Sequence, residues 1–494
     1  MNEYETKEKR FLGVLSMVIC LSLLGNIPTY AAGKTVEAFK NNTYEGTSDC
    51  KKFVNGIKQQ VPSYKSTLKQ KTGISLKSFK GKTKAIKYWA SHGSSTGRLW
   101  GSASGVDFNI HDIANFKWSG KNLEFVFLAA CYQLSGDKNR GKYANAMIGN
   151  KAVRVICGYH EKAPGAGTNK DGAVVDNFMS YAKTGESVKS SWILANKKYG
   201  NNNYLVLTHK GNVQYSRFEG FPGNTYSRPG AGSTTILRFS SAKPNGVTQP
   251  RNLSANLKLG GETDGIDIAI PNYAIKATDV DVSVKGDMDV TVLSDDGGTT
   301  TLNGEVKDQG VEITADEAED KSAEWINQAF EGVNFTDFNN GNLELREIVA
   351  AEVDLDGNSQ NEVEETVAYD VTYEYTFDGI PVKGDFYSAI VDDTGVVSSM
   401  VNHNEYEIIP SQRTVQLSLE DALKALENEV KGSGGLRIST FAAEDAVMPE
   451  ALDVNVAFCD SDNDGIFEPS YIFDLTDGSS YQVNSMTGEC LSND

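Results

Sequence analysis

A histidine and a cysteine each follow an apolar segment of this 494-residue chain. His92 comes after residues 85–91, and Cys131 closes the nearly continuous apolar run over residues 123–130. A thiol is a weak nucleophile at its usual pKa of about 8.5, and a neighbouring imidazole favours the more reactive thiolate. Such a pair can transfer acyl groups, and backbone N–H groups of the loop at Gly93 could stabilise the oxyanion that forms.

The segments before these two residues have the pattern of buried strands. Three short apolar runs predict strands: residues 85–91, 123–131 and 152–158. Helical patterns between them, such as residues 109–114 and 143–148, predict crossover helices, and this alternation is typical of a parallel sheet. Ligands bind beyond the carboxyl ends of such strands, and neighbouring strands lie about 4.8 Å apart. We therefore expect His92 and Cys131 to lie within reach of each other at one edge of an α/β domain.

The order of these residues resembles a known family. His92-Gly93 after one core strand and Ala130-Cys131 after the next is similar to the caspase-like fold shared by gingipains, clostripain, legumains and caspases. The resemblance covers roughly residues 80–210. It implies an α/β caspase-like domain with a mostly parallel sheet flanked by helices. It also implies a cysteine endopeptidase that acts on protein or peptide substrates through the two residues. The local caspase signature around the nucleophile is absent, so no specificity for aspartate is expected.

The resemblance further implies that one substrate side chain is held in a pocket near the loop after the third strand. Glu161, Asp171 or Asp176 could make that pocket acidic, which would favour arginine or lysine in the substrate. The alternative for each carboxylate is a solvated surface charge, because most Asp and Glu residues are exposed.

The net charge of −19 is divided unevenly along the chain. Residues 32–249 contain 32 Lys or Arg and 12 Asp or Glu, whereas residues 250–494 contain 12 and 51. This change falls beside residues 243–250, a segment with proline and glycine, and predicts a domain boundary. A basic surface can bind nucleic acid, but neither zinc-finger spacing nor an RNA-binding motif accompanies it, so no nucleic acid is expected. We expect the two tethered halves to attract each other instead.

The acidic half shows strand-like alternation joined by Asp/Gly turns. It divides into a β-rich linker or small domain over residues 250–310 and two repeats of one plan, residues 311–412 and 413–494. Each repeat runs from a helix through strands to a hairpin closed by Thr-Gly, at Thr394 and Thr487. This order resembles the α+β PepSY and peptidase-propeptide modules, which implies a domain that restrains or chaperones a peptidase. The alternative is a plain adhesion or spacer domain.

Residues 1–31 have the features of an export signal. Basic residues precede an apolar run over residues 11–27, and the small residues Ala31 and Ala32 follow. Cleavage after Ala31 would release a secreted or cell-surface protein. The alternative is an uncleaved membrane anchor, because an apolar run of this length is about the shortest that spans a bilayer.

Five cysteines follow the export signal, which is an odd number for a chain in an oxidising exterior. Cys459 and Cys490 belong to the same final segment and are the candidate disulfide pair. At least one of the five is expected to remain a thiol, which leaves room for Cys131 to be the unpaired one.

Metal sites have little support in the sequence. No histidine pair has metal-ligand spacing, so neither zinc nor another cofactor is expected. A weak calcium candidate is the acidic turn at Asp460, Asp462 and Asp464, which matches the first half of a calcium-binding loop. Tyr471 stands where the glutamate that completes such a loop belongs.

Two functions are compatible with these patterns. The first is an exported cysteine endopeptidase, restrained by its acidic C-terminal half. The alternative is a non-catalytic protein of the cell envelope that uses the same fold for binding or adhesion.

Overall fold

The computed structural model describes most of the chain after residue 33. The described residues are 34–40, 48–70, 85–94, 97–100, 107–109, 123–150, 152–164, 170–198, 200–211, 216–222, 234–242, 268–295, 298–338, 341–356, 361–410, 416–437, 451–462, 464–475 and 480–492. The predicted export signal and residues 110–114 of a predicted crossover helix lie outside them. Among the described residues, no helix has the length and apolar character needed to cross a membrane.

The basic half builds one side of a large sheet. Five strands lie parallel in the order β2 (Lys65–Gln70), β1 (Thr35–Lys40), β3 (Ile86–Ala90), β6 (Phe125–Ala129) and β7 (Val155–Tyr159). β8 (Tyr204–His209) and β9 (Ile236–Ser241) extend this sheet with antiparallel pairings. A separate two-stranded ribbon consists of β4 (Arg98–Trp100) and β5 (Asp107–Asn109). β3, β6 and β7 fall within or beside the three predicted strands.

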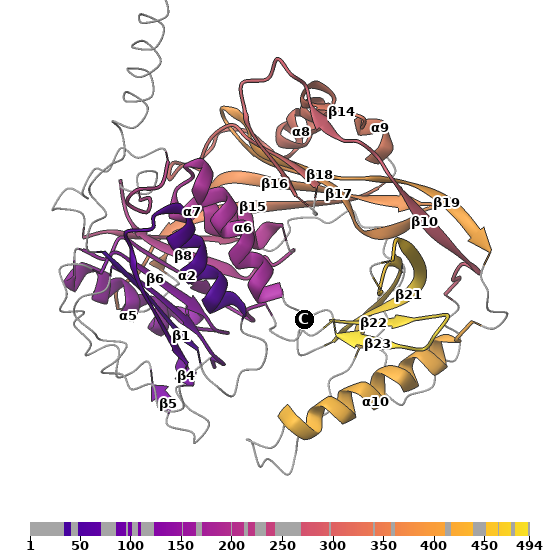
Figure 1. Ribbon diagram of the computed structural model, residues 1–494, viewed down its shortest axis with the longest axis horizontal. Coiled ribbons are helices and arrows are strands. Elements are labelled where there is room, and N and C mark those ends of the chain that lie inside the picture. Colours follow the sequence, from indigo (N-terminus) through magenta and orange to yellow (C-terminus); the bar gives the residue numbers. More distant parts are fainter. Residues whose placement is uncertain are drawn as a thin grey trace, which may run out of the picture.

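Helices cover both faces of this part of the sheet. One face carries α2 (Ser48–Gln60), α6 (Lys170–Thr184) and α7 (Val188–Lys197), and the other carries α5 (Gly136–Gly149) (Figure 1). Neighbouring residues of a strand point to opposite faces, so the continuous apolar run of β6 supplies both cores. Phe127 packs against Phe53 and Trp192 on the first face. Leu128 belongs to the core under α5 on the second.

The acidic half joins the same sheet through its first long strand. The sheet continues from β9 into β15 (Asn342–Glu352), β16 (Glu364–Phe377), β17 (Ile380–Asp392), β18 (Gly395–Asn402), β13 (Gly298–Leu302) and β12 (Thr291–Asp295). Ala350 of β15 lies opposite Phe239 of β9 in this antiparallel register. The two halves are therefore joined by backbone hydrogen bonds as well as by the attraction of opposite charges.

Two helices and a two-stranded pair cover one face of the β15–β18 region (Figure 1). They are α8 (Ala315–Ala329), α9 (Phe335–Phe338) and the β11 (Ser283–Val284) and β14 (Phe330–Glu331) pair. A capping box starts α8, in which Thr314 and Glu317 satisfy each other's backbone N–H groups. Ile326 of this helix belongs to the same buried core as Tyr387 of β17.

The last part of the chain repeats this plan on a smaller scale. It consists of α10 (Leu419–Arg437), β20 (Ala451–Cys459), β21 (Ile466–Leu475), β22 (Ser480–Asn484) and β23 (Cys490–Ser492). Leu426 of α10 shares a buried core with Phe473 of β21. β10 (Tyr273–Asp279) pairs with both β19 (Asn404–Pro410) and β21, and so connects the two repeats.

The predicted fold class is wrong. An α/β caspase-like domain with a mostly parallel sheet was expected, followed by separate acidic α+β or β-rich domains. Strands instead account for 43% and helices for 25% of the described structure, which is a large, mixed and largely antiparallel sheet. Of the twelve pairings that connect β2 to β12, four are parallel and eight antiparallel. The prediction extended a local alternation of strands and helices beyond β7, where the strand direction reverses.

The candidate disulfide between Cys459 and Cys490 is also wrong. Both residues are free thiols. Cys459 is on β20 and Cys490 on β23, with β21 and β22 between them in the sheet. Three strand spacings of about 4.8 Å separate the two backbones, whereas a disulfide needs Cα atoms within about 7 Å.

Candidate active site

His92 and Cys131 lie at corresponding positions beyond two neighbouring parallel strands. β3 and β6 pair in parallel with Ala90 opposite Ala129, and each candidate residue follows two positions later. The strands of such a pair are about 4.8 Å apart. The His92 residue is exposed and Cys131 is half-buried. This placement suits a thiol that must pass its proton to an imidazole and meet a substrate from solvent.

Cys131 is placed where the chain turns sharply out of β6. The next residue, Tyr132, has a φ of 60°, in the left-handed region that non-glycine residues rarely adopt. The Tyr132 amide donates to the backbone oxygen of Glu161 at 2.6 Å, and the Leu134 amide donates to that of Tyr159 at 2.9 Å. Backbone strain of this kind concentrates at functional sites, where the surrounding structure holds one side chain in a fixed direction.

Gly93 packs directly against the backbone at Cys131. A Cβ atom at position 93 would lie 2.1 Å from the Cys131 carbonyl oxygen and 2.6 Å from Nε2 of Gln133. Gln133 donates to that same oxygen at 3.2 Å. Glycine is therefore required where the loop after β3 meets the turn after β6. The oxyanion role of this loop stays a prediction.

The Cys131 sulfur has surroundings unlike those of the nearby cysteines. It accepts a hydrogen bond from the Ala163 amide, with N and Sγ 3.4 Å apart. Cys50 and Cys157 are buried, and burial raises the pKa of both thiols well above its ordinary value. Thiols in apolar surroundings are unreactive, whereas an N–H donor favours a thiolate. Cys131 is thus the better candidate for a nucleophile.

An acidic pocket lies beside Cys131. Its lining includes Asp49, Asp171 and Ala163, the residue whose amide meets the cysteine sulfur. The pocket is narrow, with a cavity volume of about 10 Å³, which is the room that one water molecule needs. Burial, and then repulsion from Asp49, raise the pKa of Asp171 to about 7. Burial also raises the pKa of Asp49, which accepts a hydrogen bond from Tyr88 at 3.1 Å.

One carboxyl oxygen of the pocket is unsatisfied. Oδ2 of Asp171 is buried without a hydrogen-bond partner among the described residues, while its other oxygen accepts from the Gly172 amide at 2.6 Å. A buried carboxyl oxygen without a partner is costly, and a cationic ligand would satisfy it. The pocket therefore has the charge that would attract an ammonium or guanidinium group, and it would have to widen to admit one.

The three carboxylates predicted for a substrate pocket are separated in the structure. Asp171 lines the pocket beside Cys131. Asp176 is exposed one turn further along α6 and pairs with Lys52 at 2.5 Å. The Glu161 side chain is exposed, and its backbone oxygen supports the turn at Tyr132. Asp49 was missed in the sequence, although it opens a helix soon after β1 and so lies at the same edge of the sheet.

Ion pairs join the basic half to the acidic half at α5, α7, β9 and the segment between β8 and β9. The pairs are Arg238 with Glu362 and Glu364, Arg140 with Glu362, Lys197 with Asp370, Arg217 with Glu305, and Lys210 with Glu352. Arg238 and Glu362 are the most buried, with side chains 7% and 1% exposed. β7 and β8 separate this interface from β6, so it lies at a distance from Cys131.

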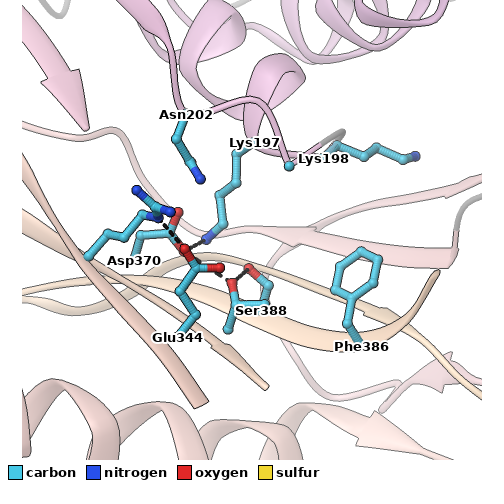
Figure 2. A pocket seen from close by; sticks show the side chains of 10 residues that line it. Lys197, Lys198, Asn202, Glu344, Asp370, Phe386 and Ser388 are labelled. Atoms are coloured by element: carbon cyan, nitrogen blue, oxygen red, sulfur yellow. Dashed lines mark hydrogen bonds and ion pairs between the residues drawn. The ribbon is translucent and has the colours of Figure 1, made fainter. Parts of the chain in front are cut away.

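A second pocket, of about 120 Å³, lies where the end of α7 meets β15, β16 and β17 (Figure 2). Lys197 extends toward Asp370, with 2.5 Å between Nζ and Oδ1, while Lys198 points away. Burial lowers the pKa of Lys197. Arg346 pairs with Glu344 at the same place. Lys197 and Arg346 are thus already paired with carboxylates. We therefore interpret this pocket as part of the contact between the basic and acidic halves and not as a ligand site.

Asp460, in the turn predicted as a calcium candidate, stabilises the backbone of that turn. Its carboxylate accepts from the amides of Asp464 at 3.1 Å and Gly465 at 3.0 Å, which closes the turn between β20 and β21. Nowhere in the described part of the chain do three His, Cys, Asp or Glu side chains gather as metal ligands would. The calcium candidate at Asp460, Asp462 and Asp464 gains no support from this geometry.

Comparison with known families covers part of the chain. Residues 83–218 match a family described as a domain of unknown function (DUF6345). The matched segment includes His92, Cys131 and Asp171 and ends before β9. No curated protein matches the chain. The family match assigns no reaction to the site.

Proposed function

We propose that this protein is an exported cysteine endopeptidase in which His92 activates Cys131. The observation that carries the proposal is the register of β3 and β6, which sets the two residues level at the carboxyl ends of adjacent strands. The left-handed backbone at Tyr132 and the Ala163 amide on the sulfur add support. The order of the two residues and their neighbours also resembles caspase-like peptidases.

The reaction would follow the course of other thiol peptidases. Cys131 gives its proton to His92, and the sulfur attacks the carbonyl carbon of the scissile peptide bond. The amine leaves with the proton returned by His92, and an acyl-enzyme remains. Water, deprotonated by the same imidazole, then releases the acid and restores the thiol.

The substrate proposed is a peptide with lysine or arginine before the cleaved bond. Asp171 and Asp49 support this choice, because their pocket adjoins the cysteine and one carboxyl oxygen has no partner among the described residues. The pocket would widen to admit the side chain. The acidic half is proposed to restrain the peptidase, as its resemblance to propeptide modules implies. The ion pairs between the halves include Arg238 of β9 and Lys197 of α7, away from Cys131. The acidic half would therefore restrain the peptidase through its docking on the basic half, without these pairs covering the cysteine.

Covalent labelling tests the proposed function directly. We expect a peptidyl acyloxymethyl ketone with lysine at the reactive end to label the full-length protein at Cys131, and Cys131→Ala to remove the label. Labelling that persists in Cys131→Ala would come from another thiol. If no reagent of a library with varied end residues gives Cys131-dependent labelling, the envelope-binding alternative is favoured.

The ionisation of Asp171 predicts a pH-dependent selectivity. With a pKa of about 7, this carboxyl is neutral at pH 6 and ionised at pH 8. The ratio of kcat/KM for a lysine substrate to that for a matched glutamine substrate should rise about tenfold over this range, because the ionised fraction rises by that factor. The ratio cancels the titration of Cys131 and His92, which both substrates share. In Asp171→Asn the ratio should be low and independent of pH, whereas an unchanged profile would exclude this pocket.

A further inference from the structure

An open pocket in the first repeat of the acidic half has no part in the proposed chemistry. It occupies about 570 Å³ and lies between α9, the end of β16 and the junction of β18 with β19. Tyr375, Tyr406 and His403 form its aromatic wall, and Asp337 and Glu405 contribute carboxylates. The pocket combines ring surface with negative charge, which is the combination that organic cations bind.

A buried hydrogen-bond network fixes the aromatic wall. Asp385 lies behind it with a side chain only 1% exposed. One of its oxygens is 2.9 Å from Nδ1 of His403, and the other accepts from the Tyr406 hydroxyl at 2.8 Å and the Asn404 amide at 3.0 Å. Every described polar atom of this carboxylate therefore has a partner. This network holds the rings of His403 and Tyr406 in place in the absence of a ligand.

The rings themselves form a continuous surface. Tyr375 and Tyr406 stack with centroids 5.6 Å apart and planes 22° from parallel. His403 lies against Tyr375 with ring centroids 5.0 Å apart, and the Phe338 ring lies 5.2 Å from that of His403. A rigid aromatic surface loses little conformational freedom on binding, which favours affinity.

The electrostatic field in the pocket is negative. Burial first raises the pKa of Tyr375, and four carboxylates raise it further: Asp385, Asp337, Asp378 and Glu405. The described residues that line the pocket include neither lysine nor arginine. The surrounding half of the chain carries 51 acidic and 12 basic residues, so the more distant field has the same sign.

We propose that this pocket binds the side chain of a lysine or arginine presented by a basic peptide. The rings would hold the cation by cation–π attraction, and Asp337 and Glu405 would accept hydrogen bonds from its N–H groups. Oxygen acceptors of this kind favour a primary ammonium or a guanidinium over a quaternary ammonium, which has no N–H to donate. This inference is independent of peptidase activity, since the pocket would bind a basic peptide in a non-catalytic protein as well.

Isothermal titration calorimetry tests the proposal on the full-length chain. The protein would carry Cys131→Ala and Asp171→Asn, so that neither cleavage nor the pocket beside Cys131 contributes. The probes are acetyl-Gly-Lys-Gly-amide, its glutamine counterpart and choline. The lysine peptide should bind with one site per chain, at least about tenfold more tightly than either other probe. Equal binding of the glutamine peptide, tighter binding of choline, or no heat with the lysine peptide at millimolar concentration would each overturn the proposal.

Two variants locate the binding. Tyr375→Ala should weaken the lysine peptide about tenfold through loss of ring surface. Glu405→Gln should weaken it about threefold, and because Glu405 is exposed this change leaves the fold intact. Glu407→Gln is the matched control, since it removes an equal charge from the same strand outside the pocket lining. Binding that is unaffected by Glu405→Gln, or weakened equally by Glu407→Gln, would place the site elsewhere.

Discussion

Replacing His92 with alanine is expected to lower kcat/KM for a lysine peptide by about 10³-fold and to leave the thermal unfolding midpoint unchanged. A positioned acid and base contributes about 10²–10⁴-fold to such a reaction. His92 lies level with Cys131 at the strand ends, and its exposure means that little packing is lost. Hydrolysis of a fluorogenic peptide, together with the rate of Cys131 alkylation near neutral pH, measures the effect. Both rates should fall.

His160→Ala is the matched control for this prediction. His160 lies in the loop after β7, is half-buried, and bonds to Asn203 through its backbone amide, which the substitution keeps. Its activity should equal that of the unmodified protein. If His160→Ala loses as much activity as His92→Ala, the loss reflects a disturbed loop. If Cys131→Ser is inactive but His92→Ala is fully active, another base serves the cysteine.

Replacing Arg238 with methionine is expected to lower the free energy of unfolding by about 3 kcal/mol, because it leaves a buried carboxylate without its main partner. Arg238 bonds to Glu362 at 2.6 Å and also pairs with Glu364. Glu362 keeps the longer contact to Arg140, at 3.4 Å, and a hydrogen bond from the Asp354 amide, at 3.3 Å. Urea unfolding followed by tryptophan fluorescence measures the change. If docking of the acidic half restrains the peptidase, Arg238→Met should also label faster at Cys131.

Lys210→Met provides the control at the same interface. Lys210 and Glu352 form an ion pair between the same two halves, but their side chains are 55% and 57% exposed. Exposed pairs contribute little, so the unfolding midpoint should not change. The double variant Arg238→Met with Glu362→Gln should regain part of the lost stability, since it removes the buried carboxylate that Arg238→Met leaves without its main partner. Equal losses in Arg238→Met and Lys210→Met would show that burial is not the cause.

Local patterns in the sequence predicted single elements better than their assembly. The apolar runs around Trp89 and Phe127 are β3 and β6, and the helical periods before Phe330 and around Leu423 are α8 and α10. The hydrophobic period of a segment shows which of its faces is buried, and this period depends only on residues close together in the chain. The direction of β8 and the pairing of β9 with β15 depend on contacts between distant residues. For that reason the fold class was wrong although many elements were right.

The same contrast between local patterns and long-range contacts applies to the candidate active site. His92 and Cys131 each follow a recognisable strand, so their common edge could be predicted from order alone. Asp49 could not, because β1 was not recognised and its partner β3 lies about 50 residues later in the chain. The disulfide prediction failed for a related reason. Nearness of Cys459 and Cys490 in the sequence does not show how many strands lie between them.

The pairing of β9 with β15 has a consequence for how the two halves can be separated. β9 has β8 on one side and β15 on the other, with residues from Leu237 to Ser241 paired to the acidic half. Proteolytic excision of that half would leave these N–H and C=O groups as an open strand edge, which readily recruits strands from other chains. A liberated basic half should therefore self-associate through β9. The acidic half covers this strand edge and so blocks this route of association, whatever its effect on catalysis.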